Sequence, residues 1–469
     1  MLVRNKCSSS VQSLAGLAII CAFASCKREP NPVPQPAASS PGSVAPAAVG
    51  GAPQQVAAQS TGGSPSSTGG ASSAPIVNKN ALSLDNISAF TAKPGAYVTI
   101  PYIGKLYDAQ NQFDKATYRF KATKANYYHV CASLASLSKD FDLSLFVNGT
   151  RESAFAQAQR GGAQGCRTIK LKANDFSEVR VQQASGTPVE FAPNDSWDWM
   201  NIQAVLGSVS LDSIEAFSAK PNTFTKVPYA SKRYDVGNQF DVKSKRFSAA
   251  EAGDYRVCAA LATSPVIFEI DIFVNDKRTN ALGYSHNGFA SGCRTVRLSK
   301  GQYVEVWTYP ATSAPQKFEP KKFWNWMTVD KVSATSAPSD VYLDNAASFA
   351  APQNTPTKVP YSRKVYDDRN QFDIRSSRFT AAEPNDYRVC ASLTSLAEDF
   401  DLSLTVNGIR DKGIAMSTKG FARGCRTVRL KNAGDYIEVQ FQQSSVASLS
   451  LPENFFWDWL TIEPLDVLK

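Results

Sequence analysis

The chain has 469 residues, of which 43% are hydrophobic and 19% charged, which is enough apolar content for several folded domains. Its 50 lysines and arginines outnumber its 41 aspartates and glutamates, and the resulting formal charge of +9 is spread along the chain. Nucleic-acid binding is therefore not expected, because it requires clustered basic residues with exposed aromatic rings. The sequence also lacks a Gly-rich phosphate loop and a zincin motif.

The N-terminus has the pattern of a bacterial lipoprotein signal. Residues 1–25 hold basic residues followed by an apolar run that is too short to span a bilayer. The run ends in Phe23-Ala24-Ser25-Cys26, which resembles the lipobox, whose cysteine is lipidated and becomes the mature N-terminus. Ordinary cleavage after Ala24 is the alternative. Lys27 follows the cysteine, which by resemblance to enterobacterial lipoproteins implies the outer membrane.

Residues 26–80 are rich in Pro, Ala, Ser and Gly and nearly free of aromatic side chains. Such a segment cannot bury enough apolar surface to offset the entropy of ordering, so we expect a disordered tether. If it behaves as a flexible chain, its reach is roughly 40 Å. We therefore expect a folded head held away from a membrane surface, on the periplasmic or the outer face.

Three similar repeats fill the rest of the chain. Tyr107-Asp108 is followed by Asn111-Gln112-Phe113-Asp114, and the same residues return at 234–241 and again at 366–373. This period is far longer than a solenoid unit, so each repeat is a complete domain. We place repeat 1 at 81–206, repeat 2 at 207–335 and repeat 3 at 336–469, with short joins near 203–208 and 330–340.

Within each repeat, short segments of alternating polarity are separated by turn signals. In repeat 3 these segments are 387–393, 400–406, 425–430, 436–441 and 456–462, and Asn407-Gly408 is a hairpin signal after the second. No segment sustains a helical period for more than a turn or two. The pattern predicts an all-β chain of three antiparallel β-sandwiches, of jelly-roll or immunoglobulin type.

Six cysteines in the repeats form three equally spaced pairs. The pairs are Cys131 with Cys166, Cys258 with Cys293, and Cys390 with Cys425, each 35 residues apart. In an exported protein this spacing predicts one disulfide per repeat. Closing a loop of this length contributes about 3.8 kcal/mol in the chain-entropy model. A zinc-thiolate site is not expected, since it needs more cysteine or histidine nearby.

The order of these elements resembles the globular head of complement C1q and the wider tumour-necrosis-factor-like jelly rolls. The resemblance rests on the Tyr-Asp and spaced Phe, the "RFTAAEPNDY" segment at 378–387, the Asn-Gly turn and the "GDYIEVQF" strand at 434–441. The cysteine pair and the Trp-Asp-Trp of the last strand depart from that family. A competing resemblance is the small β-sandwich behind secreted peptidases, whose central strand is similar to "DFDLSLFVNG" at 140–149.

The C1q-like family implies threefold association of jelly rolls. Because three jelly rolls share this chain, the resemblance implies an intramolecular pseudo-trimer. Three independent domains joined by short connectors are the alternative.

Paired acids recur in the three repeats and are the calcium candidates. They are Asp140 and Asp142, Glu269 and Asp271, and Asp399 and Asp401. Two acids at i and i+2 of a strand share one face, at a spacing that a calcium ion or a glycosidase could use. The alternatives are a solvated face, or ion pairs with Arg167, Arg294 and Arg426.

The remaining candidates are histidines, tryptophans and variable segments. His129 takes a strand position held by arginine in the other repeats, so we expect it to be exposed. His286 has no counterpart in the other repeats. Nucleophilic catalysis is not expected, because it needs a histidine placed beside a serine or cysteine. The pairs Trp197/Trp199, Trp324/Trp326 and Trp457/Trp459 could form a sugar-binding platform, although we favour packing. The segments 150–165, 277–292 and 409–424 differ between repeats and are the expected recognition loops.

Together these features predict a non-enzymatic lipoprotein of the bacterial envelope that binds a surface glycan or protein in adhesion or recognition, with no cofactor. The alternatives are a structural envelope component, a carbohydrate-active enzyme, or a peptidase-associated β-sandwich module.

Overall fold

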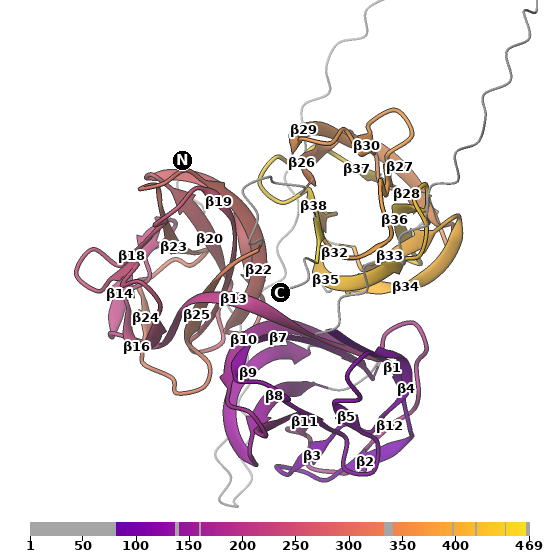
Figure 1. The fold of residues 1–469 in the computed structure, drawn as a ribbon. Helices are drawn as coiled ribbons and strands as arrows, with labels where there is room; N and C mark the ends of the chain where they lie inside the picture. The colour runs from indigo at the N-terminus through magenta and orange to yellow at the C-terminus, as the bar shows by residue number, and fades with distance from the viewer. Residues whose placement is uncertain are drawn as a thin grey trace, which may run out of the picture. The chain divides into compact units, whose positions relative to one another are not determined.

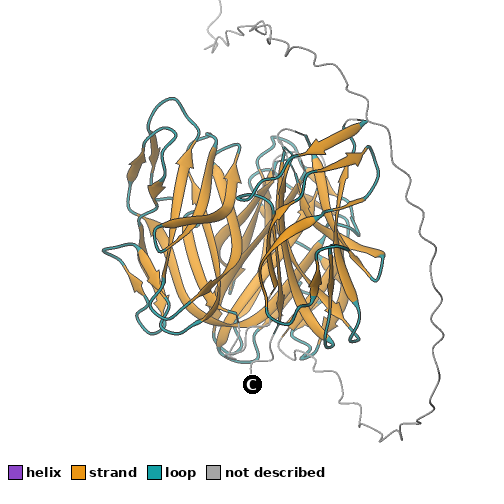
Figure 2. Cartoon of the chain, turned by 90° about the horizontal axis from the view of Figure 1, so that it is seen from above, coloured by secondary structure: helices purple, strands orange, loops and turns teal. Residues whose placement is uncertain are grey.

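The computed structural model describes residues 81–136, 140–158, 161–332, 341–395, 398–417, 420–445 and 447–465. These residues belong to one compact unit, Ser72–Lys469. The expected signal at 1–25, the lipidation residue Cys26 and the tether at 26–80 lie outside the described residues. The described part of the chain contains strands and loops, and it includes no helix that could cross a membrane (Figure 2).

The strands confirm the all-β prediction (Figure 1). Repeat 1 contains β1 (Ala81–Ile87), β2 (Phe90–Ala92), β3 (Tyr97–Thr99), β4 (Tyr102–Asp108), β5 (Phe113–Asp114), β6 (Arg119–Lys121), β7 (Asn126–Ala135), β8 (Phe141–Val147), β9 (Thr150–Ala158), β10 (Gly162–Leu171), β11 (Phe176–Gln183), β12 (Val189–Phe191) and the start of β13 (Trp199–Ile214). Repeat 2 continues with β14 (Phe217–Ala219), β15 (Thr225–Lys226), β16 (Tyr229–Asp235), β17 (Phe240–Asp241), β18 (Arg246–Ser248), β19 (Gly253–Ala262), β20 (Phe268–Val274), β21 (Lys277–Ser285), β22 (Phe289–Leu298), β23 (Tyr303–Pro310), β24 (Gln316–Phe318) and β25 (Trp326–Lys331). Repeat 3 contains β26 (Val341–Ala346), β27 (Phe349–Pro352), β28 (Thr357–Lys358), β29 (Tyr361–Asp367), β30 (Phe372–Asp373), β31 (Arg378–Thr380), β32 (Asn385–Thr394), β33 (Phe400–Val406), β34 (Ile409–Met416), β35 (Phe421–Leu430), β36 (Tyr436–Gln443), β37 (Ser448–Leu451) and β38 (Trp459–Pro464).

Each repeat is a sandwich of two antiparallel sheets with the same strand order. In repeat 1 one sheet runs β4-β1-β13-β7-β10 and the other β5-β6-β11-β8-β9, with β3 added to β11. Repeat 2 has β16-β13-β25-β19-β22 and β17-β18-β23-β20-β21, and repeat 3 has β29-β26-β38-β32-β35 and β30-β31-β36-β33-β34. Strands that are consecutive in the chain often lie in opposite sheets, so the expected jelly-roll sandwiches are confirmed.

Strand β13 belongs to two repeats. Its first half pairs with β1 and β7 of repeat 1, and its second half pairs with β16 and β25 of repeat 2. The join expected near 203–208 is therefore a continuous strand and not a connector. The second expected join, near 330–340, falls largely on residues 333–340, which are outside the described part.

The repeated Tyr-Asp and Asn-Gln-Phe-Asp motif holds a loop closed. The Asp108 carboxylate accepts hydrogen bonds from the backbone amides of Gln112 at 2.8 Å and Phe113 at 3.0 Å. Asp235 and Asp367 accept the corresponding pairs of bonds in the other repeats. The asparagine of the motif has a positive φ in all three repeats, which asparagine tolerates better than most residues. The motif is thus explained by local structure.

Two further expectations are confirmed. The three predicted disulfides are present, and each joins directly opposite residues of neighbouring strands, as in the pairing of Cys131 with Cys166 between β7 and β10. Asn407 and Gly408 have φ of 51° and 78°, as a tight two-residue hairpin between β33 and β34 requires.

Candidate functional site

The three repeats contact one another around a central junction, which we define as the place where β10, β22 and β35 meet (Figure 1). Three equivalent backbone hydrogen bonds link the repeats in the same sense. The amide of Ala154 donates to Phe323 at 2.9 Å, that of Ala281 to Phe456 at 3.0 Å, and that of Gly413 to Ser196 at 2.8 Å. Repeat 1 is thus bonded to repeat 2, repeat 2 to repeat 3, and repeat 3 to repeat 1.

Buried arginines repeat this pattern one residue after the second cysteine of each repeat. The guanidinium of Arg167 lies over Trp326 of repeat 2, that of Arg294 over Trp459 of repeat 3, and that of Arg426 over Trp199 of repeat 1, with carbon-to-ring distances of 4.9, 4.8 and 5.6 Å. Cation–π contacts of this kind strengthen when they are removed from water. The arginines expected to pair with the strand acids therefore serve the contacts between repeats instead.

The tyrosine of the repeated motif also reaches the preceding repeat. Tyr107 lies 3.7 Å from the guanidinium carbon of Arg429 and Tyr366 lies 3.8 Å from that of Arg297. In the remaining interface Tyr234 packs against Tyr127, with ring centroids 4.7 Å apart.

A polar cluster occupies one end of the junction and contains His129. The expectation that His129 is exposed is wrong, because its side chain is buried, as are Arg256 and Arg388 at the same position of the other repeats. Arg256 donates to Glu463 at 2.6 Å, and His129 Nδ1 lies 2.9 Å from the Thr168 hydroxyl. These strand positions face neighbouring repeats, and the alternation of polarity within one repeat does not reveal that burial.

Burial sets the protonation of this polar cluster. It lowers the pKa of His129 well below its usual value, and the positive charges of Arg388 and Arg256 lower it further. Burial also raises the pKa of Asp330 to about 6, although Arg256 opposes the change. His129 is therefore neutral at pH 7 and unsuited to holding a positive charge.

At the same end, the side chains of His129, Cys166 and Cys293 are of types that bind metals, and one nitrogen or sulfur atom of each lies within 4.8 Å of the others. Both sulfurs are in disulfides and lack the thiolate that a metal would bind, so this group does not form a metal site.

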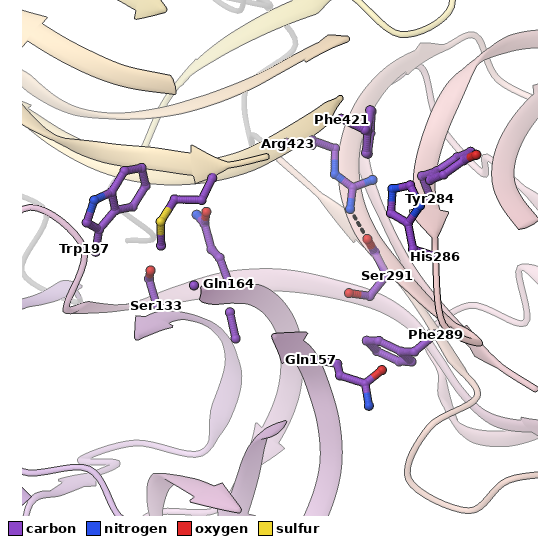
Figure 3. Close-up of a pocket in the computed structure, with 13 residues that line it drawn as sticks. Ser133, Gln157, Gln164, Trp197, Tyr284, His286, Phe289, Ser291, Phe421 and Arg423 are labelled. Atoms are coloured by element: carbon purple, nitrogen blue, oxygen red, sulfur yellow. Dashed lines mark hydrogen bonds between the residues drawn. The ribbon is translucent and has the colours of Figure 1, made fainter. Parts of the chain in front are cut away.

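A cavity of about 130 Å³ lies at the other end of the junction and is lined by all three repeats (Figure 3). Repeat 1 contributes Ser133, Gln157, Gly162, Ala163, Gln164 and Trp197; repeat 2 contributes Tyr284, His286, Phe289 and Ser291; repeat 3 contributes Met416, Phe421 and Arg423. The cavity communicates with solvent, and its lining mixes aromatic rings with neutral polar groups and one arginine. Such a mixture is typical of small-ligand sites.

Arg423 is the charged residue of this cavity. Its Nη2 donates to the backbone oxygen of Ser291 across the repeat boundary (Figure 3), whereas its Nη1 is buried without a hydrogen-bond acceptor in the described structure. Burial lowers the pKa of Arg423 to about 9, and no carboxylate of the described residues offsets that effect. A cation in this setting is incompletely compensated.

Aromatic rings of two repeats form one wall of the cavity. Phe421 packs edge-on against Trp457 with centroids 4.8 Å apart, and Tyr284 lies 5.7 Å from the same indole. Phe289 packs against Trp324 at 5.1 Å. These contacts hold the wall in place across the boundary between repeats 2 and 3.

The tryptophan pairs do not form the sugar-binding platform considered above. Trp199, Trp326 and Trp459 are at most 1% exposed and belong to the packed interior of the junction. Trp197 precedes β13 in a turn, and its ring covers Gly413 of repeat 3 so closely that a Cβ there would collide with it. The packing interpretation is therefore confirmed for these residues.

The paired acids lie at corresponding strands of the three repeats. Asp142 is in β8, Glu269 and Asp271 are in β20, and Asp401 is in β33, whereas Asp140 and Asp399 immediately precede their strands. In repeat 2 a single guanidinium, that of Arg278, bonds Asp271 at 2.8 Å and Glu269 at 3.3 Å. Burial raises the pKa of Asp142 and of Asp401 to about 6, and Arg151 and Arg410 of the same hairpins oppose the change. The alternative that these acids pair with Arg167, Arg294 and Arg426 is wrong, because other arginines lie beside them, and a cation beside each pair argues against a calcium site.

The variable segments are strands instead of loops. The described residues of 150–165, 277–292 and 409–424 lie mostly in β9, β21 and β34 and in the first parts of β10, β22 and β35. Small residues such as Ala154 and Gly413 interrupt the alternation of polarity at positions where a neighbouring repeat approaches. They nevertheless supply most of the cavity lining, which only the meeting of the repeats could reveal.

Comparisons with known proteins give little further guidance. No family model matches the chain. An uncharacterized protein of Bacillus subtilis (strain 168), YqcC, is 30% identical over 99 residues, covering 18% of this chain and 27% of that protein. The chain thus spans about a quarter of that relative. Dimeric latent PorU of Porphyromonas gingivalis matches over 74% of this chain and 35% of its own at 7% identity, with a TM-score of 0.16.

Proposed function

We propose that this protein is a non-enzymatic, lipid-anchored envelope protein whose three C1q/TNF-like domains bind a surface ligand, a glycan or a protein. The shared strand order of the three sandwiches supports the family. The three equivalent hydrogen bonds between repeats support an intramolecular pseudo-trimer, as that family implies.

The observation that carries this proposal is the cavity at the junction, because all three repeats are needed to build it. Three independent domains would not have it. An adhesive role gives a reason for joining three domains in one chain, since only the assembled head carries the site.

The position of the cavity suits an N-terminal anchor. Strands β1 and β13 are antiparallel, and Ala81 at the start of β1 pairs with Gln203 while Asp85 pairs with Trp199. Trp197, which lines the cavity, precedes Trp199 and therefore lies at the end of the sandwich opposite to Ala81. The chain thus enters the sandwich of repeat 1 at the end away from the cavity.

The chemistry of the cavity suits binding better than catalysis. The Ser291 hydroxyl donates to the backbone oxygen of Phe155 at 3.1 Å, so its hydrogen is already engaged. The side chains that remain can donate and accept hydrogen bonds and stack on a ligand, and this supports recognition as the role.

Intact cells that produce the full chain provide the test. We expect the head to be cleaved by externally added protease, and we expect these cells to adhere to acidic polysaccharide or protein coatings more than cells lacking it. Arg423→Met should reduce adhesion, whereas Arg375→Met, which removes the same charge from an exposed turn, should not. A head that is protected from protease, with no adhesion, would favour the structural envelope component instead.

A further inference from the structure

Three equivalent positions, two residues before the second cysteine of each repeat, meet in the cavity and carry different side chains. They are Gln164, Ser291 and Arg423. Gln164 donates to the backbone oxygen of Cys425 at 2.6 Å, and Arg423 donates to that of Ser291. A repeated scaffold therefore places a single cation at a point that all three repeats share.

The guanidinium of Arg423 is held against a neighbouring backbone. A Cβ at Gly292 would collide with it, so the glycine provides the space that it occupies. One of its nitrogen atoms is bonded to repeat 2, and Nη1 is buried without an acceptor among the described residues. A buried donor on a charged group is costly to leave unpaired, and the cavity that Arg423 lines can admit an acceptor from outside the chain.

Charge narrows the class of ligand. Arg423 is the one lysine or arginine among the described residues that line the cavity, and aspartate and glutamate are absent from that lining. One fixed positive charge balances one negative charge, whereas a phosphate at neutral pH carries up to two. The planar fork of a guanidinium also matches a carboxylate with two parallel hydrogen bonds.

The size of the cavity narrows the class of ligand further. The cavity has a volume of about 130 Å³ and communicates with solvent. A carboxylate with a short substituent fits this space, and a larger acidic ligand could place only its end there. Gln157 and Ser133 offer neutral hydrogen-bonding groups for that substituent, and Phe289 and Phe421 offer apolar surface.

We propose that the cavity binds a monoanionic carboxylate through Arg423 and that this ligand fastens the three repeats together. The inference deepens the proposed function, because it names the chemistry recognised at the same site. The carboxylate comes either from a free short acid or from the end of a larger acidic ligand. Because the ligand contacts all three repeats, its binding should stabilise the assembled head.

Thermal unfolding of the full chain, purified in detergent with its disulfides intact, tests this inference. At constant pH and ionic strength, acetate and lactate should raise the Tm in a saturable manner. Acetamide, which has the shape of acetate without its charge, and chloride should not. Arg423→Met should weaken acetate binding by at least about tenfold in calorimetric titration, whereas the exposed control Arg375→Met should leave it unchanged.

A measurement on the wild-type protein tests the inference even if the Arg423→Met variant does not fold. ¹³C-carboxyl acetate should show saturable line broadening with the wild-type chain, and unlabelled lactate should reverse it. An equal response to acetamide or chloride, or a full response of folded Arg423→Met, would overturn the inference.

Further ligands distinguish a free short acid from the end of a larger acidic ligand as the source of the carboxylate. A short uronic acid oligomer is compared with its methyl ester, and a peptide with a free C-terminus is compared with its amide. Binding of acetate alone assigns a free acid, and binding that the ester or amide abolishes assigns a larger ligand. If cells with the Arg423→Met variant still adhere, the carboxylate inference is rejected and the proposed adhesive function stands. If the protein binds acetate but the cells do not adhere, the adhesive function is rejected and the carboxylate inference stands.

Discussion

Asp458 shows how burial of a single carboxyl affects the stability of the fold. Its side chain is 1% exposed, and one oxygen accepts a hydrogen bond from the Thr394 amide at 3.0 Å. Burial raises its pKa to about 8, although hydrogen bonds from the backbone of Thr394 and Asn454 oppose the change. The equivalent residue of repeat 2 is Asn325, which accepts the corresponding bond from Ala262 at 2.7 Å.

The raised pKa predicts a loss of stability with rising pH. The folded chain keeps a proton on Asp458 up to about pH 8, whereas the unfolded chain releases it near pH 4, so stability falls as the pH rises through 8. Between pH 6.5 and 8.5 this group alone should cost about 2 kcal/mol. His129 contributes little over this range, because its folded pKa is lowered and its unfolded pKa of about 6.5 lies at the lower limit of the range.

We expect Asp458→Asn to remove this part of the pH dependence, as measured by urea unfolding at the two pH values. Other buried acids, such as Asp271, remain in both proteins, so the difference between them isolates Asp458. The control is Asp373→Asn, because Asp373 is exposed and its pKa is lowered by the Ser376 hydroxyl. An unchanged slope for Asp458→Asn would contradict the assignment.

Individual residues were the hardest level to predict. The repeated Tyr-Asp motif is visible in the sequence. That it closes a loop is seen only in the structure, where the Asp108 carboxylate accepts hydrogen bonds from two backbone amides. His129 was misplaced because its burial comes from other repeats, and Arg423 had no signal at all, since its position is unremarkable until Ser291 and Gln164 meet it. The period and spacing of the sequence describe the interior of one repeat, whereas the surroundings of His129 and Arg423 are formed by all three repeats.

At the scale of elements, each disulfide fastens two neighbouring strands of one sheet. Cys390 and Cys425 are direct partners in β32 and β35, at the edge of the sheet that faces the junction. In the chain-entropy model, a loop of 35 residues contributes about 3.8 kcal/mol. The double change Cys390→Ala and Cys425→Ala should lower the free energy of unfolding by about that amount in denaturant titration.

The repeat 2 pair is the matched control for this prediction. Cys258 and Cys293 have the same separation of 35 residues and the same place in the sheet, so their removal should have a similar effect. A loss below about 1 kcal/mol for either pair would show that loop closure is not the source of their contribution.

Strand β13 couples two repeats through a close approach at Gly207. A Cβ at this glycine would collide with the ring of Tyr127, which itself packs on Tyr234 of repeat 2. Gly207→Val should therefore lower the free energy of unfolding by about 1–3 kcal/mol, as overpacking of an interior does. Gly186→Val is the control, because a Cβ there meets nothing within 4 Å.

The elements themselves were largely predictable. Alternating polarity placed the strands of repeat 3 to within a few residues, and the Asn407-Gly408 turn was located correctly because its conformation depends on two residues alone. The sequence does not reveal the strands β9, β21 and β34, because small residues such as Ala154 and Gly413 remove the alternation where a neighbouring repeat approaches. The continuity of β13 could not be read either, since its pairing partner changes from β7 to β25 midway.

At the scale of the whole molecule, the contacts between repeats form a closed series. The same backbone hydrogen bond occurs at all three interfaces, from Ala154, Ala281 and Gly413, although these residues lie in segments whose sequences differ. In such a closed series, each interface is held by its own contacts and also by the contacts of the other two interfaces. Three independent domains have no such mutual support. Loss of one contact should therefore weaken the nearest interface most while the head stays folded.

Amide hydrogen exchange on the full chain measures this directly. In the wild type, the amides of Ala154, Ala281 and Gly413 should all be protected well beyond exposed loop amides, because their hydrogen-bond acceptors belong to another repeat. Tyr107→Ala removes the contact with Arg429 between repeats 1 and 3. It should reduce the protection of Gly413, which bonds Ser196 at that same interface, more than that of Ala281 between repeats 2 and 3. Tyr366→Ala, at the latter interface, should reverse the order. Rapid exchange of all three amides in the wild type would instead identify three independent domains, and the cavity at their junction would then not exist in solution.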